Sequence, residues 1–263
     1  MSGRARQHNH AILSARNVVN RFGTQIVHDR VSLDVLSGET LGITGGSGSG
    51  KSVLLRTLTG LRRPDSGEVL LDGRAVNTID PKERASLVGV LFQQGALFSS
   101  LSVAQNVMLP MREHTDLQAE DQERIAAMKL ELAGLSPESA LKFPSQLSGG
   151  MVKRAALARA LALDPRVLFL DEPTSDLDPL TASGIDMLIQ RLNEGLGVTV
   201  VLVTHDLVTL FGTCDRIAVL VDGHITVGTI TELMHSDEPW IHAFFHGPRA
   251  RGAMRARSPT HGN

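Results

Sequence analysis

A glycine-rich string, GGSGSGKS, lies between two apolar segments of different periodicity, and it restricts the possible folds more than any other feature. Before it, Leu41 and Ile43 alternate with other residues, as expected for a β-strand. After it, the segment SVLLRTLTGL has the apolar spacing of a helix and ends near Gly60. The chain is therefore predicted to run from a strand through a tight loop into a helix. The loop residues are Gly45, Gly46, Ser47, Gly48, Ser49, Gly50, Lys51 and Ser52.

This loop satisfies the P-loop pattern, whose physical use is to bind phosphate. Glycines allow successive backbone N–H groups to face an anion, and the N-terminus of the helix adds partial positive charge. We expect Lys51 to neutralise the β- and γ-phosphates of a nucleotide and the Ser52 hydroxyl to ligate Mg²⁺. The alternative is a flexible Gly/Ser linker, but a linker has no reason to end in Lys-Ser at the start of a helix.

An acidic pair, Asp171-Glu172, follows an apolar run at residues 167–170 that is predicted to be a strand. Ligands of parallel sheets bind at the carboxyl ends of strands, which is where this pair would lie. We expect Asp171 to orient the metal through water and Glu172 to polarise an attacking water. The alternative is a plain turn that ends the strand, but the presence of the P-loop argues against it.

Two Asp-Gly pairs, Asp72-Gly73 and Asp222-Gly223, each lie between apolar runs and predict antiparallel hairpins at the edges of the fold. Strand signals also occur at residues 198–203. Between this segment and residues 167–170, a helix is predicted whose apolar face includes Ile185 and Ile189. Alternating strands and helices indicate an α/β fold, with a mostly parallel sheet covered on both faces.

Strand signals disappear between about residues 115 and 163, where apolar residues keep the spacing of one helix face. We therefore expect a helical subdomain at about residues 95–165 that interrupts the sheet. The residues expected on that face are Ile125, Met128, Leu132 and Leu135.

The composition, with 42% hydrophobic and 21% charged residues in a chain of 263, fits one or two globular domains. The net charge of -2 gives no global signal for nucleic acid as a partner, and we expect none. Cys214 is the only cysteine, which excludes an internal disulfide and favours a reducing compartment. No apolar run approaches the roughly 18 residues of a spanning helix, and the N-terminus lacks a secretory pattern. We expect a cytoplasmic protein.

The string LSGGM at residues 147–151 resembles the signature of ABC-type ATPases, and the resemblance spans about residues 12–235. It implies a P-loop NTPase cassette with a RecA-like, mostly parallel sheet, an antiparallel β edge and an inserted helical subdomain. In this family the signature faces the γ-phosphate of ATP bound by the partner subunit. Locally, the same residues could simply cap a helix, and both roles can hold together. The signature residues implied are Ser148, Gly149 and Gly150.

Three further loops resemble motifs of the same family. Gln93 matches the Q-loop glutamine, which ligates Mg²⁺ and links the nucleotide site to the permease contact. Residues 175–178 match the D-loop, and Asp178 would lie at the dimer interface beside the partner's P-loop. His205 follows an apolar strand and matches the H-loop histidine, which contacts the γ-phosphate and helps to place Glu172.

Phe22 resembles the aromatic residue that stacks on adenine in this family, where tyrosine is usual; this chain contains no tyrosine. The alternative is that Phe22 is a core residue of an edge strand. Three residues depart from the family pattern: Met151, Val53 and Asp176. None is a phosphate or metal ligand, but Asp176 places a third carboxylate near Glu172, which would raise a pKa or repel phosphates unless it faces a partner.

The resemblance implies an ATPase that uses ATP and Mg²⁺ and works as a homodimer, each ATP lying between one P-loop and the other signature. It implies that Lys51, Glu172 and His205 are catalytic, and that the ligands of Mg²⁺ include Ser52, Gln93 and Asp171. A separate membrane permease would be the partner, so the chain would lie peripherally on the inner membrane.

Residues 95–103, Asn106-Val107 and 109–115 are similar to ATPases of the Mla (maintenance of lipid asymmetry) and Mce-type transporters. This branch transports phospholipids or other lipids across the bacterial envelope. The similarity implies an Mce-type lipid-binding subunit and a small regulatory subunit as further partners. One alternative is an ABC transporter ATPase for another solute, which shares every catalytic motif. Another is a non-transport ABC ATPase, but the chain has no long coiled coil, zinc insert or second cassette.

These observations divide the chain into three parts. Residues 1–11 are expected to be a flexible N-terminus, and residues 12–235 the ATPase domain. Residues 236–263 are expected to form a C-terminal extension, with one short helix around Trp240 and then a flexible basic tail.

Overall fold

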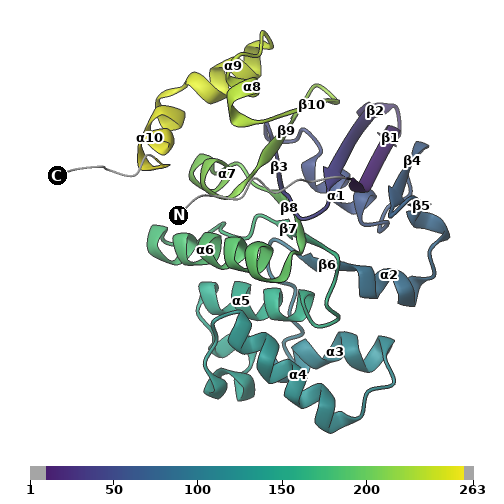
Figure 1. Ribbon diagram of the computed structural model, residues 1–263, viewed down its shortest axis with the longest axis vertical. Helices are drawn as coiled ribbons and strands as arrows, with labels where there is room; N and C mark the ends of the chain where they lie inside the picture. The colour runs from purple at the N-terminus through teal and green to yellow at the C-terminus, as the bar shows by residue number, and fades with distance from the viewer. Residues whose placement is uncertain (1–9, 258–263) are drawn as a thin grey trace.

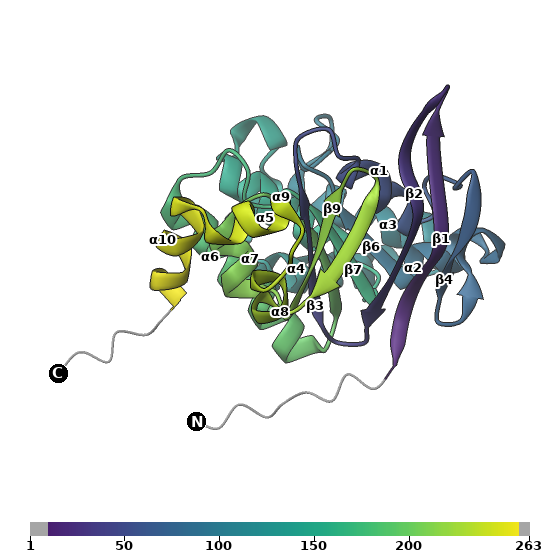
Figure 2. The same cartoon turned by 90° about the horizontal axis from the view of Figure 1, so that it is seen from above.

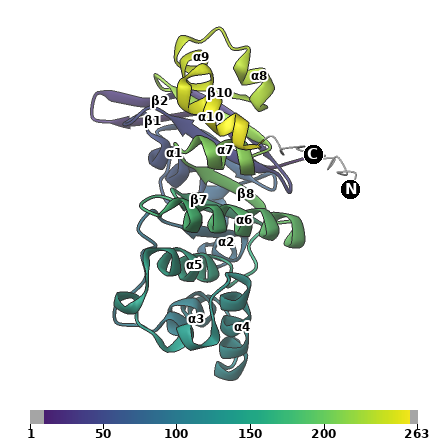
Figure 3. The ribbon, with the colours of Figure 1, turned by 90° about the vertical axis from the view of Figure 1, so that its left-hand side faces the viewer.

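The computed structural model describes residues 10–257, with side chains through Met254, so most of the N-terminal segment expected to be flexible lies outside the described residues. Two sheets lie next to each other, a group of helices covers one end of the molecule, and the C-terminal helices lie at the opposite end (Figures 1 and 3). This arrangement agrees with the α/β fold, the antiparallel edge and the helical insertion that the sequence predicts.

The larger sheet has six strands in the order β10-β9-β3-β8-β7-β6. All neighbouring pairs are parallel except β9 and β10, which form the hairpin predicted at Asp222-Gly223. Parallel strands end at the same edge of a sheet, so the loops after β3, β7 and β8 come together there. The strands are β3 (Thr40–Gly45), β6 (Val88–Leu91), β7 (Val167–Asp171), β8 (Thr199–Val203), β9 (Arg216–Val221) and β10 (His224–Gly228).

The smaller sheet is antiparallel and has the strand order β2-β1-β4-β5. Its strands β4 and β5 form the other predicted hairpin, at Asp72-Gly73. Figure 2 shows that β1 and β2 lie along the side of the larger sheet, and the Asp29 N–H donates to the Gly223 carbonyl at 2.9 Å between them. The strands are β1 (Ala11–Phe22), β2 (Gln25–Leu36), β4 (Ser66–Leu71) and β5 (Arg74–Ala75).

The core lies on both faces of the larger sheet, and strand β7 shows why. Val167 and Phe169 belong to a buried cluster with Leu54 of helix α1 (Lys51–Leu58), whereas Leu168 and Leu170 belong to a second cluster. Successive side chains of a strand point to opposite faces, so a strand buried on both sides reads as an unbroken apolar run. The second cluster also contains the apolar face of α6 (Pro179–Leu196), as the sequence predicts.

The helical subdomain consists of α3 (Val103–His114), α4 (Ala119–Leu132) and α5 (Gly149–Ala160), joined by 3₁₀ turns at Pro137–Leu141 and Pro144–Gln146. These helices pack on one another below the larger sheet (Figure 3). Helix α2 (Pro81–Leu87) leads into β6, and α7 (Leu207–Thr213) follows β8.

The face predicted for helix α4 is wrong in part. Met128 is 53% exposed and Leu132 is 38% exposed, whereas Ala126 and Leu130 are buried. Lys129 is buried as well, because its ammonium forms an ion pair with Asp164. The spacing of apolar residues therefore predicted the wrong buried face for α4. The face that packs on α3 and α5 includes the aliphatic part of a lysine side chain.

Helix α8 (Ile230–Met234) ends just before the C-terminal extension, which contains the predicted short helix α9 (Pro239–His246) and a second helix, α10 (Pro248–Arg257). Helix α10 lies where the sequence suggested a basic tail without regular structure, and the rest of that tail lies outside the described residues. Ala250 and Ala253 of α10 are buried, and α10 packs against α7. Across residues 10–257, no helix has the length and apolar character needed to cross a membrane.

Candidate nucleotide site

The P-loop connects β3 to α1 and has a backbone that only glycine adopts without strain at its two ends. Gly45 has φ 153° and Gly50 has φ 97°. A Cβ on Gly45 would lie 2.3 Å from the Leu220 carbonyl oxygen, and one on Gly50 would lie 2.4 Å from Val27 Cγ1. The loop therefore needs glycine at both positions, because side chains would collide with β9 and β2.

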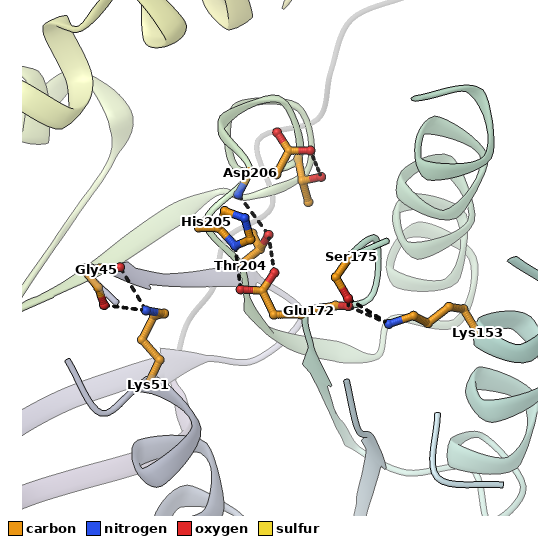
Figure 4. A network of polar contacts seen from close by, with 10 residues as sticks. Gly45, Lys51, Lys153, Glu172, Ser175, Thr204, His205 and Asp206 are labelled. Carbon is orange, nitrogen blue, oxygen red and sulfur yellow. Dashed lines mark hydrogen bonds and ion pairs between the residues drawn. The ribbon is translucent and has the colours of Figure 1, made fainter. Parts of the chain in front are cut away.

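Lys51 is the first residue of helix α1, and its side chain folds back over the loop (Figure 4). Its Nζ donates hydrogen bonds to the carbonyl oxygens of Gly45 at 2.9 Å and Gly46 at 2.8 Å. Burial lowers the pKa of Lys51, and the negative charges of Glu172 and Asp171 oppose that effect. A cation is thus held at the rim of a loop shaped for an anion, as a phosphate-binding site requires.

Asp171 is the last residue of β7 and is only 8% exposed. Burial raises the pKa of its carboxyl, the charge of Glu172 adds to this effect, and a hydrogen bond from Ser52 opposes it. Its Oδ1 has no hydrogen-bond partner among the residues that the structure describes. A buried carboxylate oxygen without a partner, beside a serine hydroxyl, fits a hard divalent cation such as Mg²⁺.

No group of three or more His, Cys, Asp or Glu side chains within residues 10–257 is arranged to hold a metal ion without help. Mg²⁺ is commonly held by one or two protein oxygens together with waters and the phosphates of a substrate. The donor set of Ser52 and Asp171 therefore fits a metal that arrives with a nucleotide.

Glu172 has a positive φ of 48°, which is rare for a residue with a side chain. Its N–H donates to the Val203 carbonyl at 2.9 Å, so strand β8 holds its backbone. The Thr204 hydroxyl donates to Oε2 at 3.3 Å, and His205 Nδ1 lies 2.9 Å from Oε1 (Figure 4). Both carboxylate oxygens are therefore held by the two residues that follow β8.

The side chains of Glu172 and His205 differ strongly in their exposure to solvent. The Glu172 side chain is 12% exposed, whereas the His205 side chain is 74% exposed. The imidazole therefore covers the carboxylate on the solvent side. Both residues line a cavity of about 620 Å³ together with Gln93, so the structure brings these three predicted residues to one space, whose lining among residues 10–257 includes none of the P-loop residues 45–52.

The signature residues lie elsewhere. Ser148 is the N-cap of α5, where its hydroxyl accepts a hydrogen bond from the Met151 N–H at 3.4 Å. Within the described residues, the lining of the cavity around Glu172 includes none of Ser148, Gly149 and Gly150. Asp178 is likewise an N-cap, accepting from the N–H groups of Leu180 and Thr181 at 3.1 Å. In a single chain, both motifs therefore cap the N-terminus of a helix.

Phe22 is the last residue of β1 and is 50% exposed, so the alternative that it is a core residue is wrong. The guanidinium of Arg62 lies 4.3 Å from the centroid of the ring. Arg62 also donates to the side-chain oxygen of Asn20 at 3.3 Å and to the Arg21 carbonyl at 2.9 Å. These contacts hold an exposed aromatic ring in place at the end of β1.

Sequence reasoning missed Thr204 and Arg62. Thr204 directly precedes His205, and a hydroxyl at the end of a buried strand next to a predicted site residue was a usable signal. Arg62 lies 40 residues after Phe22, and no local pattern connects the two. A third missed residue, Lys153, lies on the signature helix α5 and contacts the loops of Gln93 and Glu172.

Comparison with known proteins shows the family of this chain. The ABC transporter family model matches residues 28–175. The intermembrane phospholipid transport system ATP-binding protein MlaF of Haemophilus influenzae is 37% identical over 256 residues, 96% of either chain. A probable ribonucleotide transport ATP-binding protein, mkl of Mycobacterium leprae, is 39% identical over 241 residues, 90% of this chain and 69% of that protein.

Solved structures agree as well. The dimeric ATP-binding cassette MJ0796, in a post-hydrolysis state bound to ADP and Pi, matches with a TM-score of 0.76 and 36% identity. The match covers 82% of this chain and 98% of that one. The overall fold of this chain is thus that of a known ATP-binding cassette. The chain belongs to the ABC transporter family, in which it is an ATP-binding, ATP-hydrolysing subunit.

Proposed function

We propose that this ATPase energises phospholipid transport across the bacterial envelope through a separate permease. The observation that carries the catalytic part is the Glu172 carboxylate, which Thr204 and His205 hold at the cavity that Gln93 also lines. A carboxylate fixed by two neighbours and only 12% exposed is suited to orient a water for attack on a phosphate.

In this proposal the P-loop residues 45–52 bind the phosphates of ATP. Lys51 exchanges its hydrogen bonds with the loop carbonyls for bonds to the β- and γ-phosphates. Ser52, Asp171 and Gln93 would hold Mg²⁺, with Asp171 acting through water. Bound Mg²⁺ supplies positive charge against the phosphate oxygens. Phe22 stacks on adenine, and Arg62 orients its ring.

Glu172 and His205 act on the γ-phosphate side. Glu172 polarises the attacking water through the carboxylate oxygens that Thr204 and His205 orient. His205 is exposed enough to contact the γ-phosphate while it bonds to Glu172. The charge that develops at the transferring group is met by Lys51 and His205, so catalysis rests on positioned electrostatics.

The catalytic unit we propose is a dimer of two copies of this chain. Ser148, Gly149 and Gly150 open helix α5 but are not among the residues that line the cavity around Glu172 in the described part of the chain. In this proposal the N-terminus of α5 therefore serves as an anion site for a phosphate that is bound by another molecule. The similar cassette MJ0796 is dimeric in its solved structure, which supports head-to-tail pairing with ATP between P-loop and signature.

The permease contact we propose is a groove of about 480 Å³ between β6 and the helical subdomain. Leu61 and Phe98 are 58% and 53% exposed at this groove, although they are large apolar side chains. Phe92 next to Gln93 also lines it, so a helix of the permease seated there would touch the segment that carries Gln93. Binding here would place the chain peripherally on the inner membrane.

The phospholipid substrate is supported by the match to MlaF, a protein named for intermembrane phospholipid transport, over 96% of both chains. The residues 95–115 that resemble the lipid-transport branch lie beside the groove, with Phe98 and Leu109 in its lining. An Mce-type lipid-binding subunit and a small regulatory subunit are further partners in this proposal. Transport of another solute is the alternative, because mkl is named for ribonucleotide transport.

The test is a pull-down of tagged Glu172→Gln chain with ATP from its native membranes in mild detergent, followed by mass spectrometry of proteins and lipids. We expect a permease, a lipid-binding subunit and enriched phospholipid. The matched control is Leu61→Asp with Phe98→Asp, which should keep ATP binding but lose the permease. Recovery of a permease with a different solute-binding protein would overturn the phospholipid assignment and leave the ATPase assignment intact.

A further inference from the structure

Lys153 connects three loops of the candidate site through one ammonium group. Its Nζ donates hydrogen bonds to the main-chain oxygen of Gln93, to that of Glu172 at 2.9 Å and to the Ser175 hydroxyl at 3.2 Å. Figure 4 shows the lysine reaching from α5 toward Glu172 and Ser175. An ammonium has three donors, so these bonds use its full capacity.

The buried position of Lys153 depends on nearby negative charges as well as on its hydrogen bonds. Lys153 is only 6% exposed, and a buried ammonium is costly unless it is hydrogen-bonded and has negative charges close by. Burial lowers its pKa, and the negative charges of Asp176, Glu172 and Asp171 raise it. Asp176 is the carboxylate that departs from the family pattern, and Lys153 offsets its charge. The ammonium therefore offsets part of the negative charge at these loops.

The main chain near the Lys153 ammonium includes two residues in strained conformations. Glu172 has φ 48° and Asp176 has φ 62°, both in the left-handed region that disfavours residues with side chains. The Glu172 carbonyl accepts from Lys153 and also from the Ser175 hydroxyl at 2.9 Å. Conformations of this kind persist when their surroundings over-determine them, and the Lys153 ammonium is part of that surrounding.

Lys153 also lies one helical turn after the signature residues. Gly149 and Gly150 are the first residues of α5, and Lys153 follows in the same rigid helix. A shift of α5 would move Lys153 and, through its hydrogen bonds, the main chain at Gln93 and Glu172. The signature of one chain is thereby tied to the hydrolytic carboxylate of the same chain.

We propose that Lys153 is a positioning residue that holds the loops of Gln93, Glu172 and Ser175 at fixed positions relative to the signature helix α5. This inference rests on the proposed hydrolytic role of Glu172. Lys153 touches the Glu172 main chain and not its carboxylate, so it affects turnover by setting where the carboxylate lies. It does not contribute to holding the phosphates.

The test compares Lys153→Met, Lys153→Arg and wild type in steady-state ATP hydrolysis, with ATP affinity measured by calorimetry and folding by thermal melting. Methionine keeps most of the length of the side chain but removes its donors, whereas arginine keeps both charge and donors. We expect Lys153→Met to lower kcat by about tenfold to a hundredfold, since small misplacements of catalytic groups have effects of this size. ATP affinity should change by less than about threefold, and arginine should restore much of kcat.

The matched control is Arg154→Met, at the next position of α5. Arg154 donates to the Ala133 carbonyl at 2.8 Å within the helical subdomain and makes none of the three loop contacts of Lys153. Its kcat should stay near that of wild type. A folded Lys153→Met with wild-type kcat would overturn the inference, as would parallel losses of kcat and ATP affinity that arginine does not restore.

Amide hydrogen exchange gives a readout that does not need turnover. In Lys153→Met, exchange should become faster at the loops around Gln93 and residues 172–176, and it should stay unchanged at the P-loop. Equal protection in both proteins would overturn the inference. If ATP hydrolysis by the wild type did not depend on Lys51, the proposed function would be contradicted. The exchange result would still decide the role of Lys153.

Discussion

His205 Nδ1 lies 2.9 Å from Glu172 Oε1, although the two residues are 33 positions apart in the chain. Parallel strands β7 and β8 are neighbours, with Asp171 opposite Val203, so the residues that follow each strand meet. The contact gives the carboxylate a fixed direction before any nucleotide binds. The predicted consequences of this geometry can be tested one residue at a time.

Glu172→Gln should bind ATP normally but lose hydrolysis by about a hundredfold or more, the size of effect expected when a general base is removed. The amide keeps one oxygen for the Thr204 hydroxyl, so the loop should keep its shape. The variant should stall as an ATP-bound dimer. Phosphate release assays and gel filtration with ATP check both points. Wild-type turnover would contradict the role assigned to Glu172.

Lys51→Ala should weaken ATP binding by about tenfold to a hundredfold, because a hydrogen bond to a charged group contributes about 1.5–3 kcal/mol. The carbonyls of Gly45 and Gly46 would lose their donor at the same time. Isothermal titration calorimetry measures the affinity. Lys142→Ala, at an exposed lysine outside the cavity, is the control and should bind ATP as wild type does. Equal affinities of both variants would contradict the assignment.

Phe22→Ala should weaken ATP binding by about 1–3 kcal/mol, the contribution typical of a base stacked on an aromatic ring. Phe22→Tyr should keep the affinity, since the ring and its contact with Arg62 are retained. Met187→Ala removes a comparably exposed apolar side chain on α6 and serves as the control. Unchanged binding by Phe22→Ala would show that adenine stacks elsewhere.

His28 should make the protein sensitive to mild acid. Burial lowers its pKa from 6.5 to about 4, so the folded state holds His28 neutral while the unfolded chain takes up a proton below pH 6.5. The stability it contributes is complete above pH 6.5 and decreases as the pH falls toward 4, by about 3 kcal/mol in total.

Urea unfolding at several pH values between 4 and 7 measures this effect, with His28→Gln as the comparison. The variant should be less stable at pH 7, because Nδ1 of His28 lies 2.9 Å from the Asn20 amide in the buried network under the P-loop. The difference in unfolding free energy between the two proteins should shrink as the pH falls. A difference that is constant across this range would contradict the prediction.

The sequence by itself determined the parts whose cause is local. Glycine spacing predicted the P-loop, Asp-Gly pairs predicted both hairpins, and apolar runs predicted the buried parallel strands. Glu172 was predicted because it follows such a strand, and His205 because it follows another and resembles the H-loop histidine of the family. These features depend on backbone conformation and side-chain periodicity within a few residues, which a single sequence displays directly.

The tertiary structure alone decided the features that depend on distant contacts. The buried face of α4 includes Lys129 because Asp164 lies next to it, and α10 is helical where small residues pack on α7. Arg62 lies over Phe22, and Lys153 contacts Gln93 from 60 residues away. A cation looks like a surface residue in the sequence, and only the fold shows which carbonyls and carboxylates stabilise its burial.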